Sequence, residues 1–297
     1  MHYSLLRETS VVIVYKGRAF NFDAHANVSA GLDYEEYKSN RRTLHKKSNY
    51  PVSRITTQNP VSVSLAINLT NNFLETAFFD WLGMDNTGSV VWSLPYVAKA
   101  EPTKVDVYIV NTNGVNLFVE TCFVSAIDFT LEKQMPLLNI IMEGAKMSKV
   151  NDFPTFGSLS QGSVLPYSPL RVTINDQDLP GALGASVSFQ QQTSWRDQRS
   201  LHDVGSIYTH KRAYVSEMNV SATINLYLTQ RFKTDKLINM EVEYNTPLRI
   251  FNKYVAVSFP STRITKRLDV SDVYTIAYDV IPMEDSENVQ ISFIGEI

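Results

Sequence analysis

The sequence predicts a mainly β protein made of two tandem β-sandwich or β-barrel domains of one type, each with one short helix and one long loop. Residues 61–69 (VSVSLAINL) alternate apolar with small or polar side chains, a period of two that is typical of a strand with one buried face. Residues 220–228 (VSATINLYL) repeat the pattern. Five positions match at one constant offset: Val63, Ser64, Ile67, Asn68 and Leu69 match Val220, Ser221, Ile224, Asn225 and Leu226. The repeat indicates a duplicated β domain.

The composition is that of a globular protein. With 297 residues, the chain has the length of two ordinary domains, and 44% hydrophobic residues are enough to bury a core. The formal net charge of −3 gives no overall attraction to nucleic acid or to anionic lipid. No apolar run approaches the roughly 20 residues that span a bilayer, and the N-terminus lacks a signal-peptide pattern. We therefore expect a protein made in the cytoplasm, without a membrane partner.

The single cysteine, Cys122, lies in the apolar run 122–124. One cysteine excludes an intramolecular disulfide and a metal site built from several cysteines. We expect its side chain to be buried and to pack as a small hydrophobic group, and not to act as a nucleophile.

The first half contains clear strand patterns and one helix pattern. Strands are predicted at residues 11–15, 25–32, 61–69, 104–111, 115–120, 121–131 and 137–142. The Asn113-Gly114 pair between two alternating runs predicts a hairpin. Residues 71–83 carry apolar side chains at helical spacing, with Asn71 or Asn72 suited to the N-cap and Gly83 to the stop.

The domain boundary is predicted in a stretch rich in proline, glycine and serine. We place the first domain at residues 1–148, the linker at 149–169 and the second domain at 170–297. In the second domain, strands are predicted at residues 170–174, 185–190, 220–228, 247–259, 273–281 and 289–294, with a weaker helix at 229–239. Late in the two copies, Asp128 matches Asp279 and Ile140 matches Ile291 at a second constant offset.

Two long segments, residues 33–60 and 191–214, lack a strand period and occupy matching positions in the two copies. Long segments without periodicity inside a compact domain are usually functional or ordered by a partner. Basic residues with interleaved tyrosines could bind nucleic acid, but a solvated loop, or one that docks on an acidic neighbour, is the favoured interpretation. The candidate inter-subunit residues are Tyr34, Tyr37, Arg41, Arg42, Lys46, Lys47, Tyr50, Trp195, Arg196, Arg199, His210, Lys211 and Arg212.

No enzyme signature is present in the sequence. It contains no H-E-x-x-H, G-x-S-x-G, P-loop or G-x-G-x-x-G motif, and its five histidines are scattered. The neighbours His202 and Asp203 have no nucleophile beside them. We predict that the protein is not an enzyme and has no catalytic residue, cofactor or metal site.

A family resemblance is carried by two stretches. Residues 170–192 (LRVTINDQDLPGALGASVSFQQQ), followed by a long loop and VSATINLYL, resemble the tail tube protein of long-tailed bacteriophages. Residues 125–147 (SAIDFTLEKQMPLLNIIMEGAKM) resemble the closing strands of the same domain. The first copy departs from the pattern, because it lacks the turn formed by Asp178-Leu179-Pro180-Gly181.

The resemblance implies a structural subunit of the virion tail. Proteins of this type have a β-sandwich or barrel with one helix, are related in fold to a bacterial secretion-system tube protein, and form rings that stack into a hollow conduit for genome ejection. A long loop bridges adjacent rings. Two tandem copies would let three chains form a ring with pseudo-sixfold symmetry. The implied partners are further copies of the chain, tape-measure, baseplate and sheath proteins, and DNA in transient passage.

A polar strand face could line the lumen of such a tube, because large barrels enclose water-filled channels. The lumen-facing candidates are Ser62, Ser64, Asn68, Ser221, Thr223 and Asn225. Two alternatives remain. One is a ring at the end of a tube, such as a baseplate or tube-initiation component, present in few copies. The other is a carbohydrate-binding β-sandwich with Trp92 and Trp195 as an aromatic platform, although core or interface packing explains these tryptophans more simply.

Overall fold

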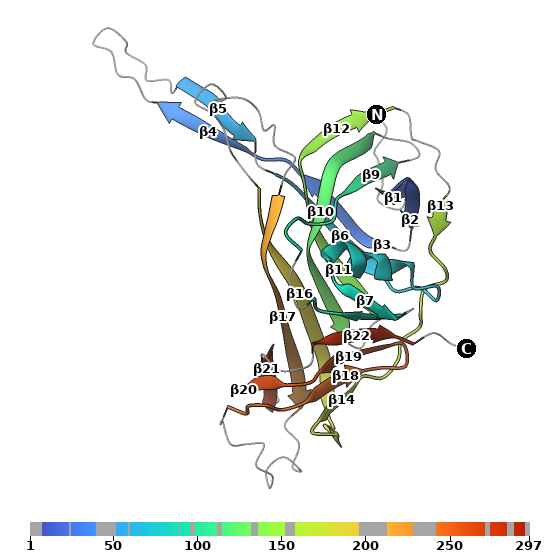
Figure 1. The fold of residues 1–297 in the computed structure, drawn as a ribbon, viewed down its shortest axis with the longest axis vertical. Coiled ribbons are helices and arrows are strands. Elements are labelled where there is room, and N and C mark those ends of the chain that lie inside the picture. Colours follow the sequence, from blue (N-terminus) through green and yellow to red (C-terminus); the bar gives the residue numbers. More distant parts are fainter. Residues whose placement is uncertain are drawn as a thin grey trace.

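The computed structural model describes residues 8–23, 25–39, 52–58, 60–88, 90–95, 99–111, 115–131, 136–151, 158–195, 213–227, 242–270, 274–283 and 288–294. Strands predominate in this part of the chain, which confirms the mainly β prediction. They form a 13-stranded sheet, a 7-stranded sheet and a separate two-stranded ribbon (Figure 1).

The larger sheet contains β1 (Thr9–Tyr15), β2 (Arg18–Phe22), β3 (His25–Gly31), β6 (Val61–Asn68), β9 (Val105–Asn111), β10 (Asn116–Leu131), β11 (Leu137–Gly144), β12 (Lys146–Val150), β13 (Ser158–Ser160), β16 (Ala182–Trp195), β17 (Ala213–Tyr227), β20 (Thr262–Val270) and β21 (Tyr274–Pro282). The smaller sheet contains β7 (Asp85–Gly88), β8 (Val91–Ser93), β14 (Arg171–Ile174), β15 (Gln177–Asp178), β18 (Leu248–Phe251), β19 (Val255–Phe259) and β22 (Gln290–Phe293). Every predicted strand overlaps one of these, whereas β20 and several short strands escaped prediction.

Strand β10 is one continuous strand of 16 residues, so the prediction of two strands at 115–120 and 121–131 is wrong. Thr121 has a φ of 54°, and the pairing with β9 shifts register there. This bend redirects the strand without ending it. Its first part pairs with β9 and β12, and its second part pairs with β11 and β16.

The predicted helix is present but short. A 3₁₀ turn at Leu74–Thr76 leads into α1 (Ala77–Leu82), and Gly83 ends it with a φ of 101°. The N-cap prediction is wrong, because the cap residue is Phe73 for the 3₁₀ turn and Thr76 for α1. The Asn72 carboxamide instead accepts hydrogen bonds from the Thr70 hydroxyl and from a backbone N–H of the segment after β13. The second predicted helix, at residues 229–239, lies outside the described residues.

The strand pairing of the first half recurs in the second half. The order β2-β1-β9-β10-β12 recurs as β15-β14-β18-β19-β22. The order β3-β6-β11-β10 recurs as β16-β17-β21-β20. Both initial hairpins turn through two residues with positive φ, Lys16-Gly17 and Asn175-Asp176, a turn that suits the twist of paired strands.

This pairing corrects the late sequence match. The second part of β10 is equivalent to β20, and β11 is equivalent to β21. Asp128, in β10, therefore corresponds to Thr265 and not to Asp279. Likewise, Ile140 corresponds to Val280 and not to Ile291. The match was out of step by one strand because apolar alternation looks alike in neighbouring strands.

The two halves share their sheets and their core. Strand β10 pairs with β16 from Ala126↔Gln190 to Leu131↔Ala185, and β8 of the first half pairs with β22 of the second. An aromatic cluster crosses the same boundary: Phe73, Phe79, Trp92, Phe189 and Phe293. Within the predicted linker, β13 pairs with β2. The division into tandem domains at residues 149–169 stays a prediction.

The ribbon consists of β4 (Tyr34–Ser39) and β5 (Val52–Gln58) and extends as an arm away from the rest of the molecule (Figure 1). The prediction that residues 33–60 contain no strand is therefore wrong. A two-stranded ribbon outside the main sheets has no need of apolar alternation, which is the pattern that reveals a strand in sequence. The second segment is also shorter than predicted, because β16 continues to Trp195 and β17 begins at Ala213.

We predict that Leu65→Asp and Ile224→Asp each prevent folding. Both side chains are fully buried in the apolar core on the central strands β6 and β17. An unpaired buried carboxylate costs several kcal/mol, a large part of the stability of a domain. Circular dichroism and the yield of soluble protein would measure the effect. The matched controls, Ser64→Asp and Ser221→Asp, lie on the exposed face and should fold. A folded, soluble Leu65→Asp protein would contradict the face assignment.

We also predict that Cys122 does not react with thiol reagents until the protein unfolds. Its side chain is fully buried, as the sequence predicts, and burial followed by the charge of Asp106 raises the pKa of the thiol. Because the thiolate is the reactive form, native protein should show no labelling at neutral pH. Adding denaturant to the same sample should release one thiol per chain. Rapid labelling of the native protein would refute this placement.

Candidate functional site

The exposed face of one half of the large sheet is lined mainly by small polar side chains, with Ile141, Tyr227 and Ile281 as exposed apolar exceptions. Eight strands share this face, in the order β3-β6-β11-β10-β16-β17-β21-β20. We call it the polar face. Paired residues cross it in rows, one of which runs Ala66, Asn139, Asp128, Ser188 and Ser221. Alternate residues of the same strands are buried in the core.

All six residues predicted to face a lumen lie on the polar face. Ser62, Ser64, Ser221 and Asn225 are exposed, and Asn68 and Thr223 are half-buried. The pairing places them there because β6 and β17 have equivalent registers in the two halves. The structure therefore brings these residues together on one surface.

The polar face carries few charges, and they are of both signs. Asp128 and Asp279 are half-buried in its middle, and the Thr223 hydroxyl lies 3.4 Å from the Asp279 carboxylate. Arg263 and Arg267 are exposed at its β20 end. This arrangement is not the basic stripe that binds the DNA backbone.

The polar face ends in two strands with partly unpaired edges. Among the described strands, β3 pairs only with β6, and β20 pairs only with β21. A short segment reaches β20 from the other side through a single bridge, Glu243↔Ile264. A strand edge presents unpaired N–H and C=O groups and can pair with another chain. Sequence reasoning missed both edges, because no local pattern in the sequence shows which strand lies at the end of a sheet.

The candidate inter-subunit residues divide into two groups. Tyr34 and Tyr37 lie in β4 of the arm, and Trp195 lies in β16, where its indole N–H donates to the Glu143 carboxylate at 3.0 Å. Burial raises the pKa of Glu143, against the lowering effect of this hydrogen bond. The other candidates lie outside the described residues: Arg41, Arg42, Lys46, Lys47, Tyr50, Arg196, Arg199, His210, Lys211 and Arg212.

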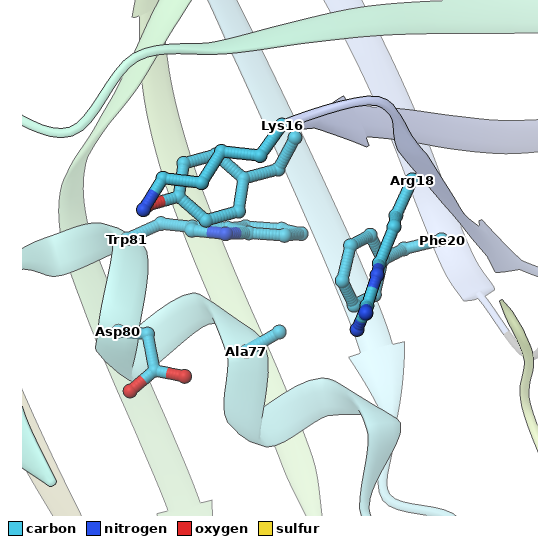
Figure 2. Close-up of a pocket in the computed structure, with 7 residues that line it drawn as sticks. Lys16, Arg18, Phe20, Ala77, Asp80 and Trp81 are labelled. Atoms are coloured by element: carbon cyan, nitrogen blue, oxygen red, sulfur yellow. The ribbon is translucent and has the colours of Figure 1, made fainter.

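A cavity of about 390 Å³ lies between the β1–β2 hairpin and α1, on the side of the sheet that the helix covers. It is lined by Tyr15, Lys16, Arg18, Phe20, Ala77, Asp80 and Trp81. Figure 2 shows Lys16 and Trp81 on one side of the opening, Arg18 and Phe20 on the other, and Asp80 on the helix. The Lys16 ammonium lies 5.0 Å from the centre of the Tyr15 ring. The one carboxylate of this lining, Asp80, accepts a hydrogen bond from the Trp92 indole N–H and so serves to join α1 to β8.

The tryptophans do not form a carbohydrate platform. Trp92 is 3% exposed, and its indole N–H donates to the Asp80 carboxylate at 2.6 Å. Trp195 stacks in a tilted arrangement on Phe123. In the described part of the chain, no group of three or more metal-binding side chains occurs. No helix there is long and apolar enough to cross a membrane.

Comparison with known proteins identifies the family. A model of the bacteriophage baseplate tube protein family matches residues 1–297. The chain is also 46% identical over 296 residues to the baseplate tube protein p140 of Escherichia phage T5, covering 100% of this chain and 99% of that protein. Both are structural tube proteins, which confirms the resemblance to phage tube proteins and the prediction that the chain is not an enzyme. The chain therefore belongs to the bacteriophage baseplate tube protein family.

Proposed function

We propose that this chain is the ring-forming subunit of a phage tube, in which each of three chains contributes two tandem tube domains around a channel for the genome. One observation carries the proposal. Inside the chain, β10 of the first half pairs with β16 of the second. The end strands β20 and β3 are the equivalents of β10 and β16 in the repeated pairing. Strand β20 of one chain can therefore pair with β3 of the next chain in the same way.

The internal junction also supplies the register of the junction between chains. Asp128 pairs with Ser188 inside the chain, so Thr265 would lie opposite Ser29 of the next chain. Each chain brings eight strands to the polar face, and three chains would close a barrel of 24 strands. Barrels of about 16–18 strands already enclose an aqueous channel, so a barrel of this size would be wide and open.

The chemistry of the polar face suits a channel that lets DNA pass. Serine, threonine and asparagine side chains keep the surface wet, and their neutrality avoids holding the phosphate backbone. The half-buried carboxylates Asp128 and Asp279 would repel phosphate at short range. The opposite face of the same strands is buried in the core, which holds the wall rigid.

The arm and the segment 196–212 are the elements that would reach neighbouring rings. The arm extends away from the main sheets, and β16 and β17 continue the sheet toward residues 196–212 (Figure 1). The further partners in this proposal are tape-measure, baseplate and sheath proteins of the virion tail. The alternative role within this proposal is a ring at the baseplate or at the start of the tube, present in few copies. The number of copies per virion, measured by quantitative mass spectrometry, separates few rings from many.

We predict that the double variant Ser29→Cys/Thr265→Cys forms disulfides between chains on oxidation. The proposed register makes these residues a non-hydrogen-bonded pair, with Cα atoms about 4.5 Å apart, which suits a disulfide. Non-reducing gel electrophoresis should show linked species up to three chains. The equivalent pair inside the chain, Asp128→Cys/Ser188→Cys, is the matched control and should link without joining chains. Failure of the first pair, with success of the control, would contradict ring closure through these edges.

We further predict that shortening residues 33–60 to a short Gly/Ser link leaves a folded chain that does not assemble stacked tubes. The arm makes its own two-stranded ribbon and is not part of the two large sheets, so its loss should spare the core. Negative-stain electron microscopy would show single rings or free subunits in place of tubes. Charge reversal at Arg41 and Arg42 should have the same effect if the neighbouring subunit is the partner. Normal tubes from the shortened chain would refute this role.

A further inference from the structure

Part of the outer edge of β20 is covered by a segment of the same chain, residues 242–246, which we call the edge cover. Glu243 and Ile264 exchange both backbone hydrogen bonds, at 3.0 and 2.9 Å, and the Thr246 N–H donates to the Thr262 carbonyl at 3.2 Å. The Thr262 hydroxyl donates to the Thr246 carbonyl at 2.6 Å. These bonds occupy the Ile264 N–H and C=O and the Thr262 C=O, at the start of the edge of β20 that faces away from β21.

The cover occupies the place that the proposed neighbour strand would take. Ile264 is the equivalent of Ile127, and Ile127 pairs with Phe189 of β16 inside the chain. In the ring, Ile264 would therefore pair with Ala30 of the next chain's β3. The cover and β3 cannot both pair with Ile264, because each residue has one N–H and one C=O on that edge.

The first half shows where the same segment lies once its edge is paired. Val107 and Ile250 occupy equivalent positions in the two halves. Ala100 lies as far before Val107 in the sequence as Glu243 lies before Ile250, so Ala100 is the equivalent of Glu243. In the first half, β16 pairs with the edge of β10. The Ala100 carbonyl accepts a hydrogen bond from the Val215 N–H of β17, at 3.2 Å. The equivalent segments of the two halves therefore lie in two different positions. The segment at Ala100 lies beside an edge that another strand pairs, and the segment at Glu243 lies on an edge that no other described strand pairs.

An ion pair between a buried lysine and a partly exposed carboxylate holds the cover in place. The Lys266 side chain is 2% exposed and ion-pairs with the Glu243 carboxylate, and its ammonium lies 5.7 Å from the centre of the Tyr278 ring. The equivalent of Lys266 in the first half is Phe129, which is fully buried in the core. A lysine at this position is explained by the carboxylate that the cover brings to it, because a buried charge needs a partner.

We infer that the edge cover is a removable self-protecting strand, which blocks β20 in the free subunit and is displaced by β3 of a second copy during ring closure. This inference rests on the proposed ring. Displacement exchanges the short cover for the six-residue ladder that the internal junction displays between β10 and β16. An exposed edge would invite unregulated pairing, and covering it with a short segment is a known way to prevent this.

The test locks the cover with a disulfide. Val242 lies opposite Thr265 beside the Glu243↔Ile264 bridge, and both side chains are at least partly exposed. In the double variant Val242→Cys/Thr265→Cys, oxidation should keep the chain monomeric and lower ring yield at least tenfold. Reduction of the same sample should restore rings to the wild-type level. Size-exclusion chromatography with light scattering measures ring yield, and circular dichroism checks that both forms are folded.

The controls separate this inference from the proposal beneath it. The single variant Thr265→Cys should form rings equally well with oxidant and with reductant. If the fully oxidised double variant forms as many rings as its reduced form, the cover does not block assembly and the inference is wrong. If Ser29→Cys/Thr265→Cys chains fail to link while Asp128→Cys/Ser188→Cys links, ring closure through these edges is wrong, and the inference falls with it.

Discussion

The structure depends on the hydrogen bonding of β10 along its whole length. Because this strand bends at Thr121 without breaking, its first part builds the outer strands of the first half and its second part builds the polar face. Its last residues pair with β16, so the two halves share one sheet and one core. The second half reaches the same arrangement with two strands, β19 and β20, separated by a short turn. A continuous strand makes the link between these outer strands and the polar face rigid, since no loop intervenes.

The repeated strand pairing is the basis of the proposed ring. The junction between β10 and β16 is closed within the chain. Strands β20 and β3, the equivalents of β10 and β16, lie at the two ends of the polar face. Backbone pairing is tolerant of side chains, so the same geometry can be reused between chains. The side chains at equivalent positions of β10 and β20 differ. Phe129 of β10 packs in the apolar core, whereas Lys266 of β20 forms an ion pair with Glu243 of the edge cover.

Much of the fold could be predicted from local patterns. The alternation in residues 61–69, with Leu65 and Ile67 fully buried and Ser64 exposed, is visible in the sequence because a strand has a period of two. The helix stop at Gly83 could be predicted for a similar reason, since a left-handed residue there favours glycine. The arm escaped prediction because a ribbon without a core face has no such alternation. The six lumen-facing candidates could be predicted from the alternation of their own strands. The extent of the polar face could not, because it depends on which strands pair.

The sequence by itself determined the β class, the match between residues 61–69 and 220–228, the polar side chains of the central strands and the resemblance to phage tube proteins. Only the tertiary structure decided which strands are partners, and so corrected the match of Asp128 from Asp279 to Thr265. It alone located the two end strands and the segment that covers one of them. The physical reason is that strand pairing is made by backbone groups common to all residues, between segments far apart in the chain. Side-chain periodicity records which face is buried, but it does not record which neighbour completes the hydrogen bonds.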